Sequence, residues 1–299
     1  MSEQRLQDSS GELRLSWLEV AGIAGVALLA GLGVAKPLYK RLDFQAGVKL
    51  ARSGMNSTTS GAREQRKLPV GKHPLQLYSA GTPNGQKVTV ALEEMGLAYD
   101  AHFIDIGKGD QFASGFVSIN PNSKIPALLD RDGPGGKEIN VFETASILLY
   151  LGEKTGKLIP EDPAKRTEMM NWIFWLHGAA PYFGQFGHFY KYASIKLGYP
   201  IERYTMETQR LLDVLDKQLE GKKYIVGDEL TLADINAMPW VNCLSQFYAG
   251  EEKLGLAKYV NVQNWMKRLK ERPAVKRGMS VNSFTAKGDA RNYSTSGSQ

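Results

Sequence analysis

The stretch LQLYSAGTPNGQKVTVALEEM, residues 75–95, decides the fold. Its apolar spacing predicts a short strand over residues 75–78, a turn over 79–85 and a helix over 86–95, whose apolar side chains recur on one face. A strand that leads through a short turn into a helix is a building unit of α/β domains. The following residues decide whether this unit stands alone or begins a longer series.

The same alternation continues along the chain. The sequence predicts, in order, a strand, a short helix, two strands and a helix, over residues 99–106, 111–118, 125–129, 138–142 and 144–154. A glycine-rich turn at residues 132–136 joins the two neighbouring strands as a hairpin. The order β-α-β-α-β-β-α predicts a small sheet covered by helices.

The strand pattern then stops, and only helix patterns follow. Thr231 and Asp234 have the spacing of a capping box at the start of one of these helices. A polar stretch at residues 159–163 separates the two regions. We therefore expect an α/β domain over residues 75–158 and an all-helical domain over residues 164–282. The helix patterns cover residues 166–177, 201–219, 232–246 and 262–271.

The two ends of the chain differ from this middle part. Residues 1–52 form a leader with an uncharged run that extends, with its flanks, over about residues 17–39. This length allows a single membrane anchor; a cleaved targeting segment and an unusual buried helix are the alternatives. If the run is an anchor, the Lys and Arg residues after it predict a position at the cytoplasmic face of a membrane. Residues 53–74 are expected to be a linker, and residues 283–299 a disordered tail.

The composition excludes several kinds of site. Cys243 is the one cysteine of the 299 residues, so an intrachain disulfide and a Cys-x-x-Cys pair are both excluded. Its apolar surroundings favour a buried structural thiol, and a chain without disulfides suits a reducing compartment such as the cytoplasm. The four histidines form no cluster with metal-ligand spacing, so we expect no metal. The net charge is +6, but no nucleic-acid motif accompanies the basic ends, and we expect no nucleic-acid partner.

The turn Gly81-Thr82-Pro83-Asn84-Gly85 is the first candidate site. It precedes a predicted helix, whose N-terminus offers free amides and partial positive charge. A ligand thiol held there by the Thr82 hydroxyl and the Asn84 amide would ionise more readily. Lowering the pKa of a thiol by about two units requires roughly 2.7 kcal/mol of preferential thiolate stabilisation. The alternative is an ordinary turn in which both residues only cap the helix.

Two further turns could bind a peptide-like ligand. Pro126 opens a predicted strand, and a cis bond before it would expose the backbone of Ile125 to an extended peptide; an edge-strand proline is the alternative. Glu143 and Thr144 begin a predicted helix, where an acid commonly compensates the helix dipole. They could instead bind the α-ammonium and the α-carboxylate of a γ-glutamyl group.

Together with further stretches, these elements resemble the glutathione transferases. The resemblance is closest to the bacterial Nu class of glutathione-dependent disulfide reductases, extends more distantly to the yeast nitrogen-regulating prion protein, and covers about residues 56–281. It implies a thioredoxin-like N-terminal domain, an all-helical glutathione transferase C-terminal domain, a homodimer, a cis bond before Pro126 and two glutathione molecules in each site. The matching stretches are residues 68–75, 81–88, 109–112, 120–127, 141–143, 146–151, 170–172, 187–190, 210–216 and 271–277.

The resemblance also implies roles for individual residues. The class has Glu-Ser at the position of Glu143-Thr144, and the hydroxyl is kept. The class has Gln at the position of His177, which bears on the second glutathione; an interdomain surface histidine is the alternative. The implied ligand contacts are Thr82 and Asn84 at the reacting sulfur with Pro83 between them, Gln111 at the glycyl end, Ile125 at the peptide backbone, Glu143 and Thr144 at the γ-glutamyl end, Asn56 from outside the main domains, and Arg203 at a glutathione carboxylate.

Three functions fit this sequence. The leading hypothesis is thiol–disulfide exchange by the thiolate of bound glutathione, which needs no cysteine of the protein. The second is conjugation of glutathione to an electrophile, and the third is a regulator that binds glutathione without turnover. For the second, a group of aromatic residues could receive a planar electrophile, although such a group between two domains more often serves packing; its members are Tyr182, Phe183, Phe186, Phe189 and Tyr192.

Overall fold

The computed structural model describes residue 48, residues 58–285 and residues 293–295. The leader segment at about residues 17–39 and Asn56 lie outside the described residues. In the part that is described, no helix is both long and apolar enough to cross a membrane. The α/β region consists of β1 (Leu75–Ser79), α3 (Pro83–Met95), β2 (Tyr99–Phe103), η1 (Asp110–Phe112), α4 (Ser114–Ile119), β3 (Ala127–Asp130), η2 (Pro134–Gly136), β4 (Ile139–Phe142) and α5 (Thr144–Thr155).

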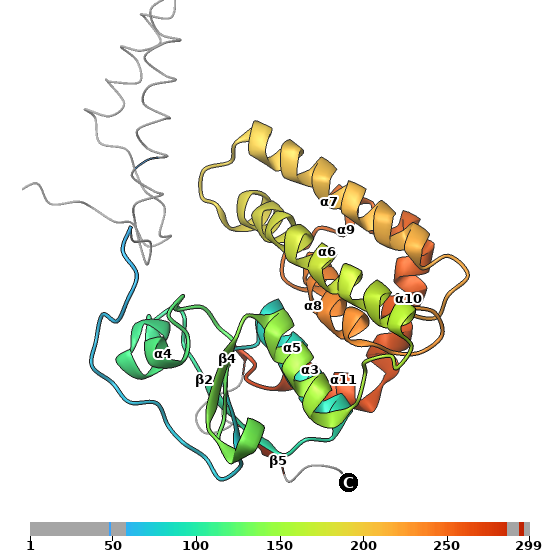
Figure 1. Cartoon of the computed structure of the whole chain (residues 1–299). Coiled ribbons are helices and arrows are strands. Elements are labelled where there is room, and N and C mark those ends of the chain that lie inside the picture. The colour runs from blue at the N-terminus through green and yellow to red at the C-terminus, as the bar shows by residue number, and fades with distance from the viewer. Residues whose placement is uncertain (1–47, 49–57, 286–292, 296–299) are drawn as a thin grey trace, which may run out of the picture. The chain divides into compact units, whose positions relative to one another are not determined.

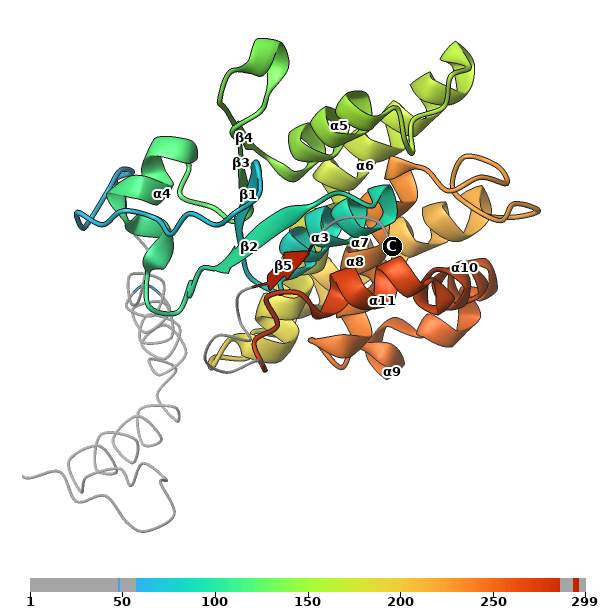
Figure 2. The ribbon, with the colours of Figure 1, turned by 90° about the horizontal axis from the view of Figure 1, so that it is seen from below.

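The strands form one sheet in the order β4-β3-β1-β2-β5, in which β1 and β2 run parallel and the other pairs antiparallel. Figure 1 shows β2 and β4 of this sheet next to α3 and α5. Alternate residues of a strand face opposite sides, and β1 follows this rule. Leu75 and Leu77 belong to the core shared with α3 and α5, whereas Tyr78 belongs to a smaller core with Phe116 of α4. Figure 2 shows α4 on one side of the sheet and α3 and α5 on the other. The predicted β-α-β-α-β-β-α order is confirmed.

The fifth strand corrects the expectation of a disordered tail. β5 (Tyr293–Thr295) pairs with residues 99–101 of β2. The Tyr293 hydroxyl donates a hydrogen bond to Glu93 Oε1 at 3.0 Å, and its ring lies 5.5 Å from that of Tyr99. The prediction is wrong for these three residues, because a strand this short shows no alternation of its own and depends on the exposed edge of β2.

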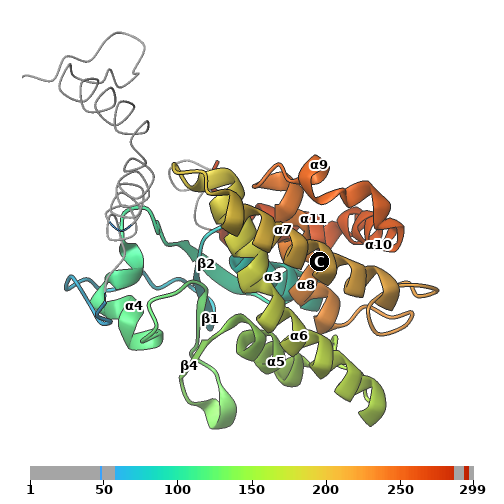
Figure 3. The same cartoon turned by 90° about the horizontal axis from the view of Figure 1, so that it is seen from above.

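The second region is helical, as predicted. Figure 3 shows α6, α7 and α8 running beside one another. The capping box of α8 is present: Thr231 Oγ1 accepts from the amide of Ala233, and Asp234 Oδ2 accepts from the amide of Thr231. The elements are α6 (Pro163–Gly187), η3 (His188–Tyr192), α7 (Gly198–Gln218), α8 (Leu232–Gln246), α9 (Glu251–Leu254), η4 (Leu256–Lys258), α10 (Val260–Glu271) and α11 (Pro273–Ser280).

Helix α11, which the periodicity did not predict, fastens the helical region to α3. Gly278 lies so close to α3 that an added Cβ would meet the Val90 backbone at 2.6 Å, and Thr89 Oγ1 donates to the Gly278 carbonyl at 2.7 Å. Arg272 binds Glu94 through two hydrogen bonds of 2.6 and 2.7 Å. This packing holds α3 between the α/β region and the helical region. The N-terminus of α3 therefore lies where the two regions meet.

Candidate active site

A cavity of about 410 Å³ lies where the α/β region meets the helical region. Residues from α3, from the turn before β3, from the start of α5 and from α6 and α8 line it. Six of the residues singled out from the sequence are among them: Asn84, Ile125, Pro126, Glu143, Thr144 and His177. The lining residues are Asn84, Lys87, Asn120, Asn122, Lys124, Ile125, Pro126, Glu143, Thr144, His177, Ala180, Pro181, Gly184, Gln185 and Trp240.

The N-terminus of α3 places Asn84 in this cavity. Thr82 is the N-cap residue, and its Oγ1 accepts a hydrogen bond from the amide of Gly85 at 3.2 Å. Asn84 Oδ1 accepts from the indole N–H of Trp240 at 2.8 Å. Because an indole nitrogen only donates, this bond commits the amide oxygen of Asn84 and leaves its amino group to donate to a ligand. The arrangement provides hydrogen-bond donors at a helix N-terminus, where an anion is stabilised.

Trp240 is therefore expected to orient Asn84. Trp240→Phe removes the indole N–H and keeps most of the aromatic ring. The side-chain amide of Asn84 can then rotate, and its amino group is no longer held in the direction of the ligand. We expect about a tenfold loss in the rate of the reaction that uses this site, equal to one ordinary hydrogen bond. Steady-state kinetics measures it, with Trp175→Phe on α6 as the matched indole control. Equal rates for the Trp240 variant and the wild type would contradict the role.

The start of α5 provides a second set of polar groups. Glu143 precedes the helix with a φ of 65°, a conformation that costs a non-glycine residue free energy, and its carbonyl accepts from the amide of Ile147. Its side chain is exposed, whereas Thr144 is buried. A carboxylate beside the first amides and hydroxyl of a helix can bind a group that carries both an ammonium and a carboxylate.

The turn before β3 completes the cavity. The peptide bond between Ile125 and Pro126 is cis, as the resemblance implies. The side chain of Asn120 holds this turn, because its Nδ2 donates to the Lys124 carbonyl at 2.6 Å and its Oδ1 accepts from the amide of Asn122 at 2.9 Å. Ile125 lies two residues before the start of β3 and lines the cavity, so an extended peptide can lie along it.

Lys87 is a residue of the site that sequence reasoning missed. It is 1 % exposed, and its Nζ donates to Thr144 Oγ1 at 3.2 Å. Burial lowers the pKa of Lys87 to about 7, and the nearby Glu143 opposes this shift. Lys87 comes three residues after Asn84 and so lies on the same face of α3, but this spacing alone does not indicate a buried lysine, because lysines on helices are normally solvated.

His177 faces the same group of charges from α6. Its Nε2 is buried and has no hydrogen-bond partner among the described residues. Burial lowers the pKa of His177, Lys87 lowers it further, and Glu143 opposes both. The imidazole is therefore neutral near pH 7 and can accept or donate one hydrogen bond at the cavity wall.

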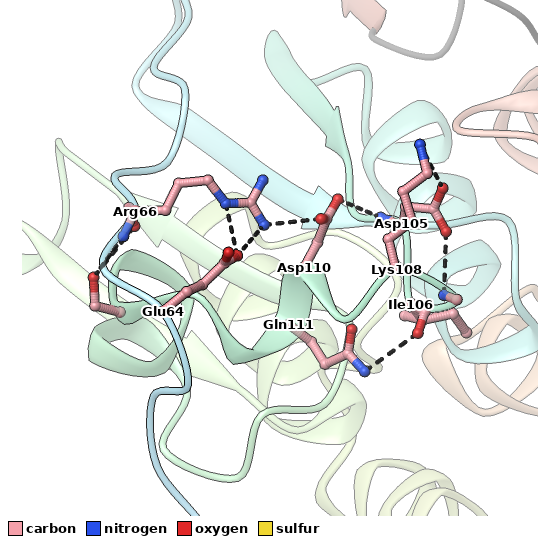
Figure 4. Close-up of polar contacts among 9 residues, drawn as sticks. Glu64, Arg66, Asp105, Ile106, Lys108, Asp110 and Gln111 are labelled. Atoms are coloured by element: carbon pink, nitrogen blue, oxygen red, sulfur yellow. Dashed lines mark hydrogen bonds and ion pairs between the residues drawn. The ribbon is translucent and has the colours of Figure 1, made fainter. Parts of the chain in front are cut away.

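Other predicted site residues lie away from the cavity lining. Thr82 and Pro83 adjoin it through Asn84 without lining it. Gln111 lies in η1, where its Nε2 donates to the Ile106 carbonyl at 3.4 Å (Figure 4), and its buried Oε1 has no hydrogen-bond partner in the described part of the chain. Arg203 lies on α7 with Glu207 at 3.9 Å.

The segment before β1 holds the turn that carries Gln111. Figure 4 shows Arg66 between Glu64 and Asp110, with nitrogen–oxygen distances of 2.8 Å to each. Asp110 also accepts from the amide of Asp105 at 2.9 Å. Part of the expected linker is thus paired with η1 through Arg66 and Asp110, and this contact helps to hold Gln111 in its place in the fold.

Known proteins that resemble this chain identify its family. The family model of the glutathione S-transferase N-terminal domain matches residues 82–154, and that of the C-terminal domain matches residues 202–273. The disulfide-bond oxidoreductase YghU of Escherichia coli is 57 % identical over 249 residues, which are 80 % of this chain and 85 % of that protein. The chain belongs to the glutathione S-transferase family.

Solved structures of glutathione transferases agree. The YghU transferase of Streptococcus pneumoniae, complexed with glutathione, is 50 % identical with a TM-score of 0.73, over 76 % of this chain and 90 % of that chain. The Burkholderia graminis transferase, with two glutathione molecules bound per subunit, is 43 % identical with a TM-score of 0.69, over 72 % and 90 %. The transcriptional regulator URE2 of Saccharomyces cerevisiae is 30 % identical over 68 % of each chain. The family and the fold class expected from the sequence are confirmed.

Proposed function

We propose that this glutathione transferase is a glutathione-dependent thiol–disulfide oxidoreductase. One observation carries the proposal: a single cavity brings together Asn84 at the N-terminus of α3, Ile125 at the cis bond, and Glu143 with Thr144 at the start of α5. In this proposal, these groups bind the sulfur, the peptide backbone and the γ-glutamyl end of one glutathione, in that order. The name of the Escherichia coli relative and the ligands of the two solved transferases support it.

The reaction uses two molecules of glutathione for each disulfide. The thiolate of the first, stabilised by Thr82 and Asn84, attacks one sulfur of the substrate, the S–S bond breaks, and the departing thiolate takes up a proton. The thiolate of the second attacks the mixed disulfide and forms glutathione disulfide while the second half of the substrate leaves as a thiol. Two electrons pass from two glutathione thiols to the substrate disulfide, so no other reductant is required.

Roles for the other predicted residues are part of the proposal. Gln111 would bind the glycyl end of glutathione, Arg203 a glutathione carboxylate, and Asn56 would reach the ligand from outside the two main domains. His177 would bind the second glutathione through the buried Nε2 that has no partner in the described part of the chain. Each role requires a direct contact between glutathione and the named side chain, and a crystal structure with bound glutathione tests whether that contact exists.

The protein's own thiol is not expected to take part. Cys243 is fully buried, its Sγ donates to the Trp240 carbonyl at 3.0 Å, and burial raises the pKa of Cys243 to about 12. A thiol with so high a pKa is a poor nucleophile near pH 7. Cys243→Ala should keep the rate of disulfide reduction by glutathione within about twofold, measured by coupling glutathione disulfide formation to its re-reduction. A folded but inactive variant would reject a mechanism that relies on glutathione sulfur alone.

Conjugation to an aromatic electrophile finds less support in the geometry. The aromatic residues that could receive such a substrate do not line the cavity. Phe183 and Phe186 are buried in the core, and the ring of Phe189 stacks on Tyr204 at 5.6 Å. Turnover of a simple disulfide should therefore exceed that of a halogenated nitroarene, and the opposite preference would favour conjugation.

We also propose a homodimer. Phe142, Phe174, Tyr182 and Met206 are exposed apolar side chains on β4, α6 and α7, and a second copy of the chain would cover such side chains. Light scattering after size exclusion tests this. The segment at about residues 17–39 stays a proposed anchor, in the cytoplasm or at the cytoplasmic face of a membrane, which fractionation of cells with a tagged full-length chain tests.

A further inference from the structure

Lys87 occupies an unusual position for a lysine. Its side chain is 1 % exposed, and the bond that its Nζ makes is to the neutral hydroxyl of Thr144. Among the described residues no carboxylate lies within ion-pair distance of Nζ. A buried ammonium without a counter-charge is costly, so its position at the wall of a cavity requires an explanation.

The hydrogen bond from Lys87 fixes the direction of the Thr144 hydroxyl. A hydroxyl has one hydrogen to donate, and because Oγ1 already accepts from Nζ, that hydrogen points away from Lys87. Thr144 is the first residue of α5, where the helix amides have no partner within the helix. The Lys87 ammonium, the Thr144 hydroxyl and these amides are therefore the donors of one anion site.

We propose that Lys87 binds the α-carboxylate of the γ-glutamyl group and holds the Thr144 hydroxyl so that it donates to the same carboxylate. This rests on the proposed function only in taking glutathione as the ligand. Glu143, the residue directly before Thr144, binds the α-ammonium. The α-ammonium and the α-carboxylate of the γ-glutamyl group are thus bound by side chains of opposite charge, and Lys87 makes the site specific for a carboxylate.

Other charges near Lys87 do not replace this anion. Glu143 is exposed and His177 is neutral near pH 7, while Lys124 lines the same cavity with a positive charge. On the faces of α3 and α8 that turn toward α10 and α11, the carboxylates have partners of their own. These pairs are Glu93 with Arg277, Glu94 with Arg272, and Asp234 with Trp265.

A proton accompanies binding if the proposal is correct. Burial lowers the pKa of Lys87 to about 7, so at about pH 7.5 a large share of the free protein carries a neutral lysine. A carboxylate beside Nζ favours the ammonium and raises this pKa. Binding therefore takes up a proton, and affinity falls as the pH rises above about 7, by up to tenfold per pH unit.

Titration calorimetry tests this with S-methylglutathione, which has no ionisable thiol. The apparent binding enthalpy of the wild type, compared in two buffers of different ionisation enthalpy at about pH 7.5, should reveal proton uptake. Lys87→Met should abolish the uptake and weaken binding about tenfold or more. His177→Gln should keep the uptake, which assigns it to the lysine. Wild-type affinity in Lys87→Met overturns the proposal, and so does proton uptake that Lys87→Met retains in full.

Two analogues separate carboxylate recognition from a merely structural role. S-methylated γ-aminobutyryl-cysteinylglycine lacks the α-carboxylate, and S-methylated glutaryl-cysteinylglycine lacks the α-ammonium. Lys87→Met should leave the affinity for the first unchanged and weaken binding of the second about tenfold. Equal losses for both would mean that the substitution disturbs the cavity and would overturn the proposal. Disulfide turnover by the wild type is measured separately, so failure of the proposed reaction is distinguished from failure of this inference.

Discussion

Thr82→Ala combined with Asn84→Ala should lower kcat/KM for disulfide reduction by about 10²–10³-fold, the effect of removing a positioned donor from a developing or bound anion. The Thr82 oxygen accepts from the amide of Gly85 and keeps its hydrogen for the sulfur, and the Asn84 oxygen is held by Trp240 so that its amino group donates. Without the Thr82 hydroxyl and the Asn84 amino group, the thiolate is stabilised only by the free amides at the N-terminus of α3. Less of the bound glutathione is then ionised near pH 7. Initial rates with a small disulfide at several glutathione concentrations provide the measurement.

The matched controls separate chemistry from helix capping. Thr82→Ser keeps both the hydroxyl and the cap and should keep the rate, whereas Thr82→Ala also costs about 1 kcal/mol of stability through the lost cap. Rates are therefore compared well below the melting temperature of the weakest variant. Asn140→Ala, an exposed amide on β4, is the control for Asn84. Full activity of the double variant would show that the two residues only cap α3.

Glu143→Gln should weaken glutathione binding by about 10²-fold, since it leaves the α-ammonium of the bound glutathione without a negative charge beside it. Gln keeps the size of the side chain and the backbone at a φ of 65°, but it no longer neutralises the α-ammonium of the γ-glutamyl group. The measurement is a calorimetric titration with S-methylglutathione at constant pH.

Two comparisons give this experiment its specificity. Glu138→Gln, an exposed glutamate five residues earlier, should bind like the wild type. The analogue without an α-ammonium should bind equally to the wild type and to Glu143→Gln. If Glu143→Gln retains the affinity of the wild type for S-methylglutathione, the γ-glutamyl end does not lie at the start of α5.

The sequence predicts the elements that depend on local pattern. The strand, turn and helix of residues 75–95 are all present, and the capping box of Thr231 and Asp234 is found because both partners lie within one turn. β5 and α11 are not predicted. β5 depends on the free edge of β2 and has no signal within its own three residues. α11 begins at Pro273, which is a helix-start signal, but it is only eight residues long and packs on α3 through Gly278, so its apolar periodicity is too short to stand out.

The site follows the same division. The turns at Asn84, Ile125 and Glu143 can be found from the sequence because each begins a helix or a strand. Lys87 cannot, because a lysine in an amphipathic helix is normally solvated, and its burial becomes visible only when α5, α6 and α8 cover it. The aromatic residues at positions 182–192 do not line this cavity, and Phe183 and Phe186 pack in the core, which is the alternative that the sequence left open.

The central claim is that the N-terminus of α3 ionises a sulfur that belongs to the ligand. Thiolate absorbance of glutathione bound to the Cys243→Ala protein, followed through a pH titration, tests it most directly, since no protein thiol contributes to the signal. The account predicts a pKa roughly two units below that of free glutathione, returning toward the free value when Thr82 and Asn84 are both replaced by alanine. A bound thiol that titrates like free glutathione in the Cys243→Ala protein would contradict it.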